Sequence, residues 1–347
     1  MQMKKYKVVD IFSGIGSFHL GFQRANFNII FSTDNNIYCE ESHKFNFPNI
    51  NYFNKDILDI DEKFLNKHLK YKTRSDVLIG GPPCQGFSTI GSRVSSDPLK
   101  RKKKDLRNNL VFEFVRILAI LKPKIFLMEN VRGILTRNQG IIFAKLMEEF
   151  DNINYFTKYA IVNAKDYGVA QNRERVFVIG SSKKINLDFP LPTHGNDRLS
   201  LKPYVTIKDV ISDLKDIEDS KNNHVPLKHK EKNLKRYKLI PEGGRMPEHK
   251  LSKELYRKNF GNTFKRLNRN EPSLAMVPGH NAFPIHPWYN RSLTAREAAR
   301  IQSIPDKIKF FGPRHEQCIQ VGNAVPTILA YKFAIHIKKL LKKNYDK

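Results

Sequence analysis

Two side chains in the first half of the sequence have the chemistry of a nucleophile and of an acid. Cys84 directly follows the rigid bend Gly80-Gly81-Pro82-Pro83 at the end of an apolar run. A thiol presented outside a sheet at such a bend is a candidate nucleophile if its surroundings favour the thiolate. Glu129 ends the next apolar run and could serve as an acid or as a hydrogen-bond partner. Taken singly, a cysteine is more often a small buried residue and a glutamate a surface group or helix N-cap, so both interpretations stay open at this point.

A glycine turn near the N-terminus could hold a small ligand. Gly14 and Gly16 follow the apolar run Lys7–Phe12, and glycines there let the backbone approach a ligand closely. Gly21 lies too far along the chain to complete a G-x-G-x-x-G pattern, which disfavours a pyrophosphate site and with it a nicotinamide oxidoreductase. A ligand with ribose and adenine but no phosphate still fits, with Asp34 accepting from the ribose hydroxyls. A plain tight turn is the structural alternative.

Short apolar runs that alternate with a helical pattern predict the sheet that positions these side chains. We expect strands at Lys7–Phe12, Phe27–Phe31, Asp76–Ile79, Ile125–Met128 and Arg175–Ile179. Between the third and the fourth, apolar residues recur at helical spacing from Leu110 to Leu121, and Pro123 ends that helix. The alternation predicts an α/β fold with a mostly parallel, doubly wound sheet. Because ligands bind at the carboxyl ends of parallel strands, the residues that follow these strands should gather at one edge.

The composition changes after Gly180 and predicts a second, smaller and irregular domain. The chain is polar from there to about Pro278, and order returns near Arg291. Thr294 and Glu297 form a capping box that begins a helix, which we expect Pro305 to end, and a last helix follows Pro326. We therefore divide the chain into residues 1–185, residues 186–290, and residues 291–347, which return to the first domain.

The charge balance favours a polyanionic partner. The 347 residues include 61 Lys and Arg against 34 Asp and Glu, a formal net charge of +27. Such a surface attracts nucleic acid and suits cationic substrates poorly, although the codon bias of an AT-rich genome would also enrich lysine. Three cysteines cannot form a disulfide framework and fit a reducing compartment. We find no apolar run long enough for a transmembrane helix, no signal peptide and no zinc-like spacing of His and Cys.

Several sequence blocks, in this order, resemble the cytosine-C5 DNA methyltransferases. They are Asp10–Gly16, Gly81–Ser88, Glu129–Val131, Gln171–Arg175 and Gln320–Pro326, and Arg291–Glu297 also resembles the family's late motif. The blocks run from residue 10 to residue 326, so they frame nearly the whole chain. The resemblance implies a Rossmann-like, S-adenosylmethionine-dependent methyltransferase that acts on cytosine in a specific double-stranded DNA sequence. The departures are Ser17, Asn108-Asn109 and Thr327, and none of them removes a reacting group.

The resemblance implies a covalent mechanism. Cys84 would attack C6 of the cytosine, and Glu129 would hydrogen-bond or protonate N3, so that C5 takes the methyl group of S-adenosylmethionine. Loss of the C5 proton and of Cys84 would then restore aromaticity, with S-adenosylhomocysteine as the second product. Arg175 would hold the base and the carboxylate in register, and Arg173 would assist near the thiol or a phosphate. The chemistry requires a flipped-out base.

The cofactor residues are implied in the same way. Phe12 would stack on adenine, and Asp34 would bind the ribose at a position where the family more often has Glu. Asp56, followed by Ile57, would read the adenine amino group. The other implied cofactor residues contact the methionine part, pack against the cofactor or help to position it, and they are Asp10, Gly14, Gly16, Leu110 and Asn323. We expect no metal.

The implied DNA contacts lie in two regions. The polar stretch from Gln85 to Arg107 carries Lys100–Lys104, which is either a solvated linker or, as we hypothesise, a mobile lid with cations near phosphates. Residues 186–290 take the place of the family's target-recognition domain, while residues 1–185 would bind the cofactor and carry out catalysis. The predicted substrate and DNA contacts are Gln85, Ser88, Asn130, Lys102 and Lys103.

Two alternatives within the resemblance stay open. One is the tRNA-directed branch of the family, which the Gly86-Phe87-Ser88 continuation and the long insert after Gly180 disfavour. The other is a non-catalytic DNA-binding relative, which would be expected to lack Cys84 or Glu129. For the enzyme we expect a monomer in the bacterial cytosol or nucleoid, with no membrane contact and with a separate restriction endonuclease as the partner of a restriction–modification system.

Overall fold

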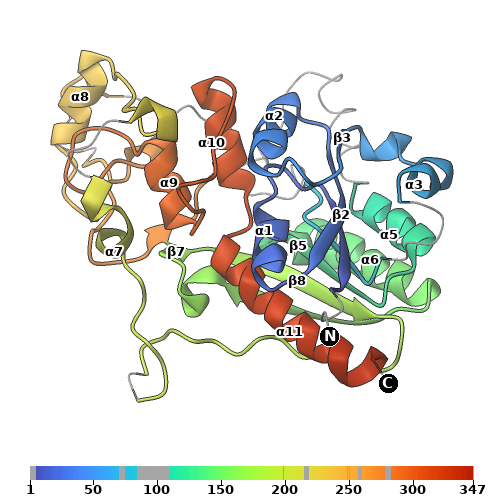
Figure 1. The fold of residues 1–347 in the computed structure, drawn as a ribbon. Helices are drawn as coiled ribbons and strands as arrows, with labels where there is room; N and C mark the ends of the chain where they lie inside the picture. The colour runs from blue at the N-terminus through green and yellow to red at the C-terminus, as the bar shows by residue number, and fades with distance from the viewer. Residues whose placement is uncertain are drawn as a thin grey trace. The chain divides into compact units, whose positions relative to one another are not determined.

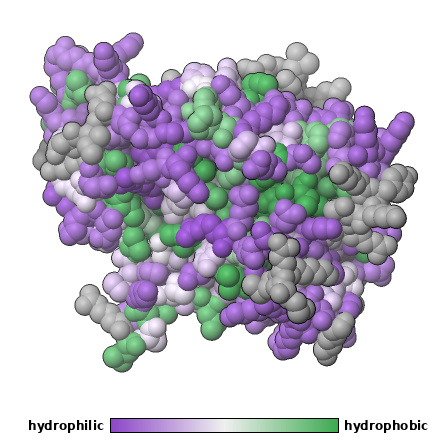
Figure 2. All heavy atoms as spheres, in the orientation of Figure 1, coloured by the Kyte–Doolittle hydropathy of each residue, from purple (hydrophilic) through white to green (hydrophobic). Residues whose placement is uncertain are grey.

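The structure is a computed structural model, and it describes residues 5–69, 75–83, 110–197, 199–214, 219–247, 249, 251–256, 260–277 and 283–346. The chain divides into two compact units. Unit 1 comprises Met1–Asn163, Glu174–Leu191 and Leu329–Lys347, and unit 2 comprises Ala164–Arg173 and Pro192–Ile328. The face in Figure 2 is mostly hydrophilic, with smaller apolar patches between. Among the described helices, none is both long and apolar enough to cross a membrane.

Unit 1 is built on a seven-stranded sheet with the order β3-β2-β1-β4-β5-β8-β6. The neighbours from β3 to β5 pair in parallel, whereas β8 runs antiparallel to both β5 and β6. This confirms the mostly parallel α/β fold. The strands are β1 (Lys7–Ile11), β2 (Asn28–Asp34), β3 (Tyr52–Asn54), β4 (Val77–Gly80), β5 (Ile125–Val131), β6 (Phe156–Asn163) and β8 (Glu174–Ser181). All five expected strands are present, and the sequence analysis missed β3 and β6.

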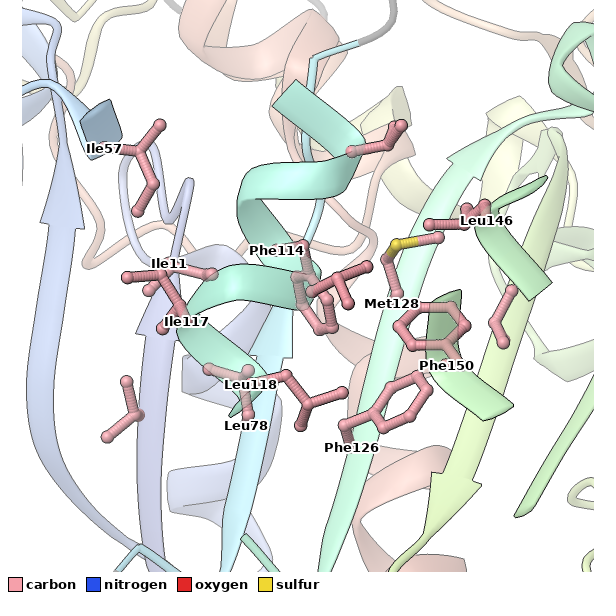
Figure 3. Close-up of a cluster of buried hydrophobic side chains, with 14 of the residues drawn as sticks. Ile11, Ile57, Leu78, Phe114, Ile117, Leu118, Phe126, Met128, Leu146 and Phe150 are labelled. Carbon is pink, nitrogen blue, oxygen red and sulfur yellow. The ribbon is translucent and has the colours of Figure 1, made fainter. Parts of the chain in front are cut away.

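Helices cover both faces of this sheet, as a doubly wound fold requires (Figure 1). One face packs against α3 (Glu62–His68), α5 (Leu110–Leu121) and α6 (Ile141–Asn152), through the buried cluster in Figure 3. The cluster contains Phe114, Ile117 and Leu118 of α5 together with Phe126 and Met128 of β5, and the rings of Phe114 and Phe126 lie with their centroids 5.7 Å apart. On the other face lie α1 (Ser17–Arg24) and α11 (Thr327–Tyr345), while α2 (Ile37–Asn46) follows β2. The predicted helices at 110–121 and after Pro326 are confirmed.

Unit 2 has little regular structure. It holds α7 (Ile207–Ile211), α8 (Glu231–Lys238), α9 (Ala295–Ile301), α10 (Arg314–Asn323) and a two-stranded sheet of β7 (Gln171–Asn172) and β9 (Ser273–Leu274). Much of it is held by arginines that donate to carbonyls: Arg266 donates to four backbone oxygens, those of Tyr237, Ile240, His286 and Tyr289. Such guanidinium hubs replace the hydrogen-bond ladders that an irregular chain lacks.

Two local predictions in unit 2 have different outcomes. The capping box is confirmed, because Thr294 accepts from the Glu297 amide and Glu297 accepts from the Thr294 amide. The helix ends at Ile301 rather than at Pro305, where we had placed its end, and Ser303 follows with a positive φ of 58°. The sequence analysis missed α10.

The boundaries of the two units differ from the expected domains. Residues 291–328 fall in unit 2, and only Leu329–Lys347, which holds most of α11, returns to unit 1. The functional roles of the domains stay predictions.

Candidate active site

The carboxyl edge of the sheet in unit 1 has a topological switch point between β1 and β4. From β1 the sheet continues to β2 and β3 on one side and to β4 and β5 on the other. Ile11 at the end of β1 pairs with Gly80 at the end of β4, and Gly80 pairs with Met128 of β5. Ligands of open α/β sheets bind outside the strand ends at such a point. The glycine turn after β1 and the segment after β4 therefore flank the expected binding position.

The glycine turn contains three residues with positive φ angles, a conformation that favours glycine at two of them. Phe12, Gly14 and Gly16 have positive φ angles of 56°, 53° and 82°. A Cβ atom added to Gly16 would lie 2.4 Å from Cε1 of His19, so this glycine is needed for packing. A Cβ atom added to Gly14 would meet no heavy atom of the described residues within 4 Å, so these residues leave space beside the backbone there. Gly14 is the position where a ligand can approach the main chain.

Asp34 is oriented by the same turn. The Gly14 amide donates to Asp34 Oδ2 at 2.9 Å, and the Asn36 amide donates to Oδ1 at 3.1 Å. Burial raises the pKa of the Asp34 carboxyl, and the backbone amides of Gly14, Asn36 and Asn35 counteract that rise. A carboxylate fixed in this way at the end of β2 can accept from a diol such as a ribose.

Asp10 and His19 form a fully buried pair behind the turn. Asp10 Oδ2 lies 2.9 Å from His19 Nδ1, and both side chains are fully buried. Burial, and then the nearby Asp34, raises the pKa of Asp10 well above its usual value, and burial lowers the pKa of His19 to about 3. Both shifts have the same main cause, because burial disfavours the charged form of each side chain. Within the described part of the chain, Asp10 Oδ1 has no hydrogen-bond partner.

The predicted adenine side is assembled from three segments. Asp56 precedes the short 3-10 turn η1 (Ile57–Asp59), and its Oδ1 accepts from the Leu58 amide at 3.1 Å. Its Oδ2 accepts from Asn35 Nδ2 at 3.3 Å, which ties it to the residue after Asp34. Ile57 is buried in the cluster of Figure 3, and Leu110 at the start of α5 packs against that cluster. The structure thus brings Asp34, Asp56, Ile57 and Leu110 to one side of the sheet edge.

Glu129 and Arg175 form an ion pair near the same edge. Because β8 is antiparallel to β5, Arg175 pairs with Val131 at the end of β5. Arg175 Nε lies 3.1 Å from Glu129 Oε1, and the two side chains are only 17% and 11% exposed. The pairing holds the glutamate carboxyl in one orientation with little solvent around it.

The segment that leads into Cys84 lies against this pair. A Cβ atom added to Gly81 would lie 3.4 Å from Glu129 Oε2. The Asn130 side-chain amide donates to the Pro82 carbonyl at 3.4 Å, and Asn130 Oδ1 accepts from the Val131 amide at 2.8 Å. Asn130 therefore joins the end of β5 to the chain just before the cysteine.

The remaining predicted site residues either lie outside the described residues or belong to unit 2. Cys84, Gln85, Ser88, Lys102 and Lys103 lie outside the described residues. Arg173 and Asn323 belong to unit 2, where the buried Arg173 donates from Nη1 to the Gly322 carbonyl at 3.1 Å and Asn323 ends α10. The roles assigned to all seven stay predictions. In the part of the chain that is described, no cluster of three or more His, Cys, Asp or Glu side chains could hold a metal ion.

The sequence analysis missed three side chains that support the site. They are His19, Asn35 and Arg116 of α5, which donates to the carbonyls of Ile57 and Ile60. The position of His19 between the apolar residues Phe18 and Leu20, directly after the glycine turn, was a signal for it. The other two act on partners at least 21 residues away, which no local pattern indicates.

Comparison with known proteins identifies the family. The family described as C-5 cytosine-specific DNA methylase matches residues 6–339. The chain is 34% identical over 341 residues to the type II methyltransferase M1.HphI of Haemophilus parahaemolyticus, covering 96% of this chain and 86% of that protein. It is 33% identical over 379 residues to the type II methyltransferase M.DdeI of Desulfomicrobium norvegicum, covering 95% and 88%.

A solved structure agrees with the sequence relatives. The E. coli protein described as a DNA modification methyltransferase encoded within a prophage has a TM-score of 0.78 to this chain at 26% identity, and the match covers 97% of this chain and 100% of that one. The match therefore includes both compact units. With a family match from residue 6 to residue 339, the chain belongs to the C-5 cytosine-specific DNA methylase family and is a DNA cytosine-C5 methyltransferase.

Proposed function

We propose that this enzyme methylates C5 of a flipped-out cytosine in a specific double-stranded DNA sequence through a covalent bond between Cys84 and C6. The observation that carries the proposal is the buried ion pair of Glu129 and Arg175 beside the segment that leads into Cys84. Asn130 links that segment to the strand that carries Glu129. A nucleophile and a carboxyl group on neighbouring segments are what covalent activation of a pyrimidine requires.

The Cys84 thiolate would form a bond to C6, and the π pair of the C5–C6 double bond would move to C5 while Glu129 hydrogen-bonds or protonates N3. S-adenosylmethionine, when bound, would supply the methyl group to C5, with the electron pair of the sulfonium–methyl bond left on sulfur. The C5 proton then leaves to solvent, the Cys84–C6 bond breaks, and Glu129 recovers the N3 proton. Arg175 keeps the Glu129 carboxyl directed at the base.

The residues of unit 1 fit S-adenosylmethionine. The open space beside Gly14 admits a ligand, and Asp34 is held ready to accept from ribose hydroxyls. Asp10 has one oxygen without a hydrogen-bond partner in the described part of the chain, which suits a donor or cation near the methionine part. Phe12, Ile57 and Leu110 would hold the adenine, with Asn323 of unit 2 as a further positioning residue.

The biological setting follows from the relatives. Both named relatives are type II methyltransferases, which supports a role in a restriction–modification system with a separate endonuclease. Residues 186–290 would recognise the DNA target, with Gln85, Ser88, Lys102, Lys103 and Arg173 near the substrate. The enzyme would act as a monomer in the bacterial cytosol or nucleoid, without a metal and with S-adenosylhomocysteine as product.

The test is the variant Cys84→Ser. It should abolish methyl transfer and the covalent trap with 5-fluorocytosine DNA while still binding S-adenosylmethionine. Cys39→Ala, at a buried cysteine of α2 that has no role in the proposed chemistry, is the matched control and should still be trapped. Methylation by the serine variant would contradict the mechanism. Methyl transfer to tRNA instead of duplex DNA would favour the tRNA-directed branch. Bisulfite sequencing of DNA from cells that express the enzyme would give the recognition site.

A further inference from the structure

The short turn that carries the proposed adenine contacts has little structure of its own. The turn η1 spans only three residues, Ile57–Asp59. Its backbone hydrogen bonds run from the Asp59 amide to the Asp56 carbonyl at 3.0 Å and from the Ile60 amide to the Ile57 carbonyl at 3.2 Å. A helix this short does not hold itself in water, so contacts from outside must fix its position.

Packing fixes only one side of this turn. Ile57 and Ile60 are 5% and 0% exposed and belong to the cluster that α5 completes, and Figure 3 places Ile57 above the α5 side chains Phe114 and Ile117. Leu58 between them is 61% exposed. Apolar packing is not directional, so it sets how deep the turn sits but leaves its rotation and register poorly defined.

Arg116 supplies the directional contacts. From α5 its Nη1 donates to the Ile60 carbonyl and its Nη2 to the Ile57 carbonyl, each at 2.7 Å. Its Nε donates to Glu113 Oε2 at 2.6 Å, one turn earlier on the same helix. A guanidinium is planar and its donors are fixed relative to one another, so it fixes the spacing of the two carbonyls as a flexible ammonium cannot. The turn is thereby clamped to α5 at both of its ends.

We propose that Arg116, held in place by Glu113, is a positioning residue that sets the register of the turn so that Asp56 reads the amino group of the cofactor's adenine. The inference rests on the proposed function, because it takes Asp56 as the acceptor for that amino group. Arg116 itself does not touch the cofactor. It acts through the carbonyl of Ile57, which directly follows Asp56, and Asn35 holds the carboxylate from the other side.

The test measures discrimination between two forms of the base. S-adenosylhomocysteine and its analogue with hypoxanthine in place of adenine are titrated into the full-length protein by calorimetry. Hypoxanthine has a carbonyl oxygen where adenine has an amino group. The carboxylate of a well-placed Asp56 would therefore lose the amino group as its hydrogen-bond donor and would lie opposite another acceptor oxygen. Hydrogen bonds to charged groups are worth enough that the wild type should prefer the adenine form by about tenfold or more.

The variants separate positioning from general stability. Arg116→Met should bring the preference to within about twofold, and Arg116→Lys should give an intermediate ratio, because an ammonium can reach one carbonyl but not hold both. Arg24→Met, at an exposed arginine that ends α1, is the matched control and should keep the full preference. A merely structural arginine would weaken both ligands equally and leave the ratio unchanged. If Arg116→Met does not fold, the ratio of Arg116→Lys decides.

The outcomes distinguish this inference from the proposed function. The wild-type preparation is also tested for covalent trapping on 5-fluorocytosine DNA. If the wild type is trapped but the Arg116 variants keep the full preference for adenine over hypoxanthine, the positioning role of Arg116 is overturned while the proposed function stands. A wild type without preference for adenine also overturns it, because Asp56 then reads nothing that Arg116 could position. Loss of trapping in the wild type contradicts the role of Cys84 and leaves the binding ratio as an independent measurement.

Discussion

His43 lies in a buried aromatic cluster beside the glycine turn, and its replacement by phenylalanine should make unit 1 less sensitive to acid. Its ring centroid is 4.9 Å from that of His19, 5.1 Å from Phe47 and 4.3 Å from Tyr52. Neither ring nitrogen has a hydrogen-bond partner among the described residues. A phenyl ring is flat and aromatic like imidazole but cannot take up a proton. Its larger size changes the packing equally at every pH, so the pH-dependent part of the effect of His43→Phe isolates the protonation of the nitrogens.

The magnitude follows from the pKa difference between the folded and unfolded chain. Burial, and then the charge of His19, lowers the pKa of His43 to about 2, whereas an unfolded histidine titrates near about 6.5. As the pH falls below about 6.5 the unfolded chain takes up a proton that the folded protein does not, so the free energy of unfolding decreases. The loss is about 1.4 kcal/mol per pH unit, or about 2 kcal/mol at pH 5.

The neighbouring groups do not obscure this effect. The pair of Asp10, whose pKa is raised by burial, and His19, whose pKa is lowered by burial, is present in both proteins, so its contribution to the slope cancels in the comparison. The raised pKa of Asp34 opposes the slope of His43 but is present in both proteins. The difference between wild type and variant therefore reports His43.

Hydrogen exchange of the β1 and β2 amides at pH 5 and pH 7.5 is the appropriate assay. The single tryptophan, Trp288, belongs to unit 2, so its fluorescence would report the other unit. The slowest amides give the unfolding free energy of unit 1. The stability of His43→Phe relative to wild type should be about 2 kcal/mol higher at pH 5 than at pH 7.5. Tyr52→Phe, in the same cluster, should show no such change, and an equal difference at both pH values for His43→Phe would refute the burial argument.

Three further predictions follow from the site. Arg175→Met should lower kcat about a hundredfold under saturating substrates, because Glu129 loses the partner that orients it, and an unchanged kcat would contradict that role. Gly14→Ala should weaken binding of S-adenosylhomocysteine in calorimetry. It should lower the free energy of unfolding by only about 1 kcal/mol, because φ is positive but the new Cβ meets none of the described residues. Gly16→Ala should instead destabilise unit 1 in hydrogen exchange, because its new Cβ meets the His19 ring. Replacement of the five basic residues Lys100, Arg101, Lys102, Lys103 and Lys104 by glutamine should flatten the salt dependence of DNA binding. An equal slope in a filter-binding titration would refute contact of these cations with phosphates.

The central strands were predictable because their physics is local. Val77–Gly80 and Ile125–Val131 are covered on both faces, so they appear in the sequence as continuous apolar runs. Each run ends just before the candidate site residues that follow it. By contrast β6 (Phe156–Asn163) is an edge strand in which only Val162 is buried. Its apolar residues are interrupted by Thr157 and Lys158 and follow no burial pattern that would mark a strand. With three residues, β3 is too short for any periodicity to appear.

Strand direction was not predictable, and it decides where Arg175 lies. Arg175 is near the start of its strand, so in a fully parallel sheet it would lie at the edge opposite to the end of β5. Because β8 runs antiparallel to β5, its first residues pair with Val131 and bring the guanidinium to Glu129. The family resemblance implied this role for Arg175, but the pattern of apolar residues could not supply it. The contacts of Arg116 and Asn35 depend in the same way on how distant segments meet.

Net charge and local charge point in opposite directions in this protein. The chain carries +27, which alone would disfavour a cationic ligand. The proposed cofactor site nevertheless includes the carboxyl groups of Asp10, Asp34 and Asp56. These residues lie at or just after the carboxyl ends of the neighbouring strands β1, β2 and β3. Two of them have pKa values raised by burial, a cost that a nearby positive charge such as a sulfonium or an ammonium would relieve. If the proposed function holds, the basic excess would attract DNA over long distances, whereas the buried carboxyls would set the preference for the cofactor, because interactions at short distance in a buried site are screened far less.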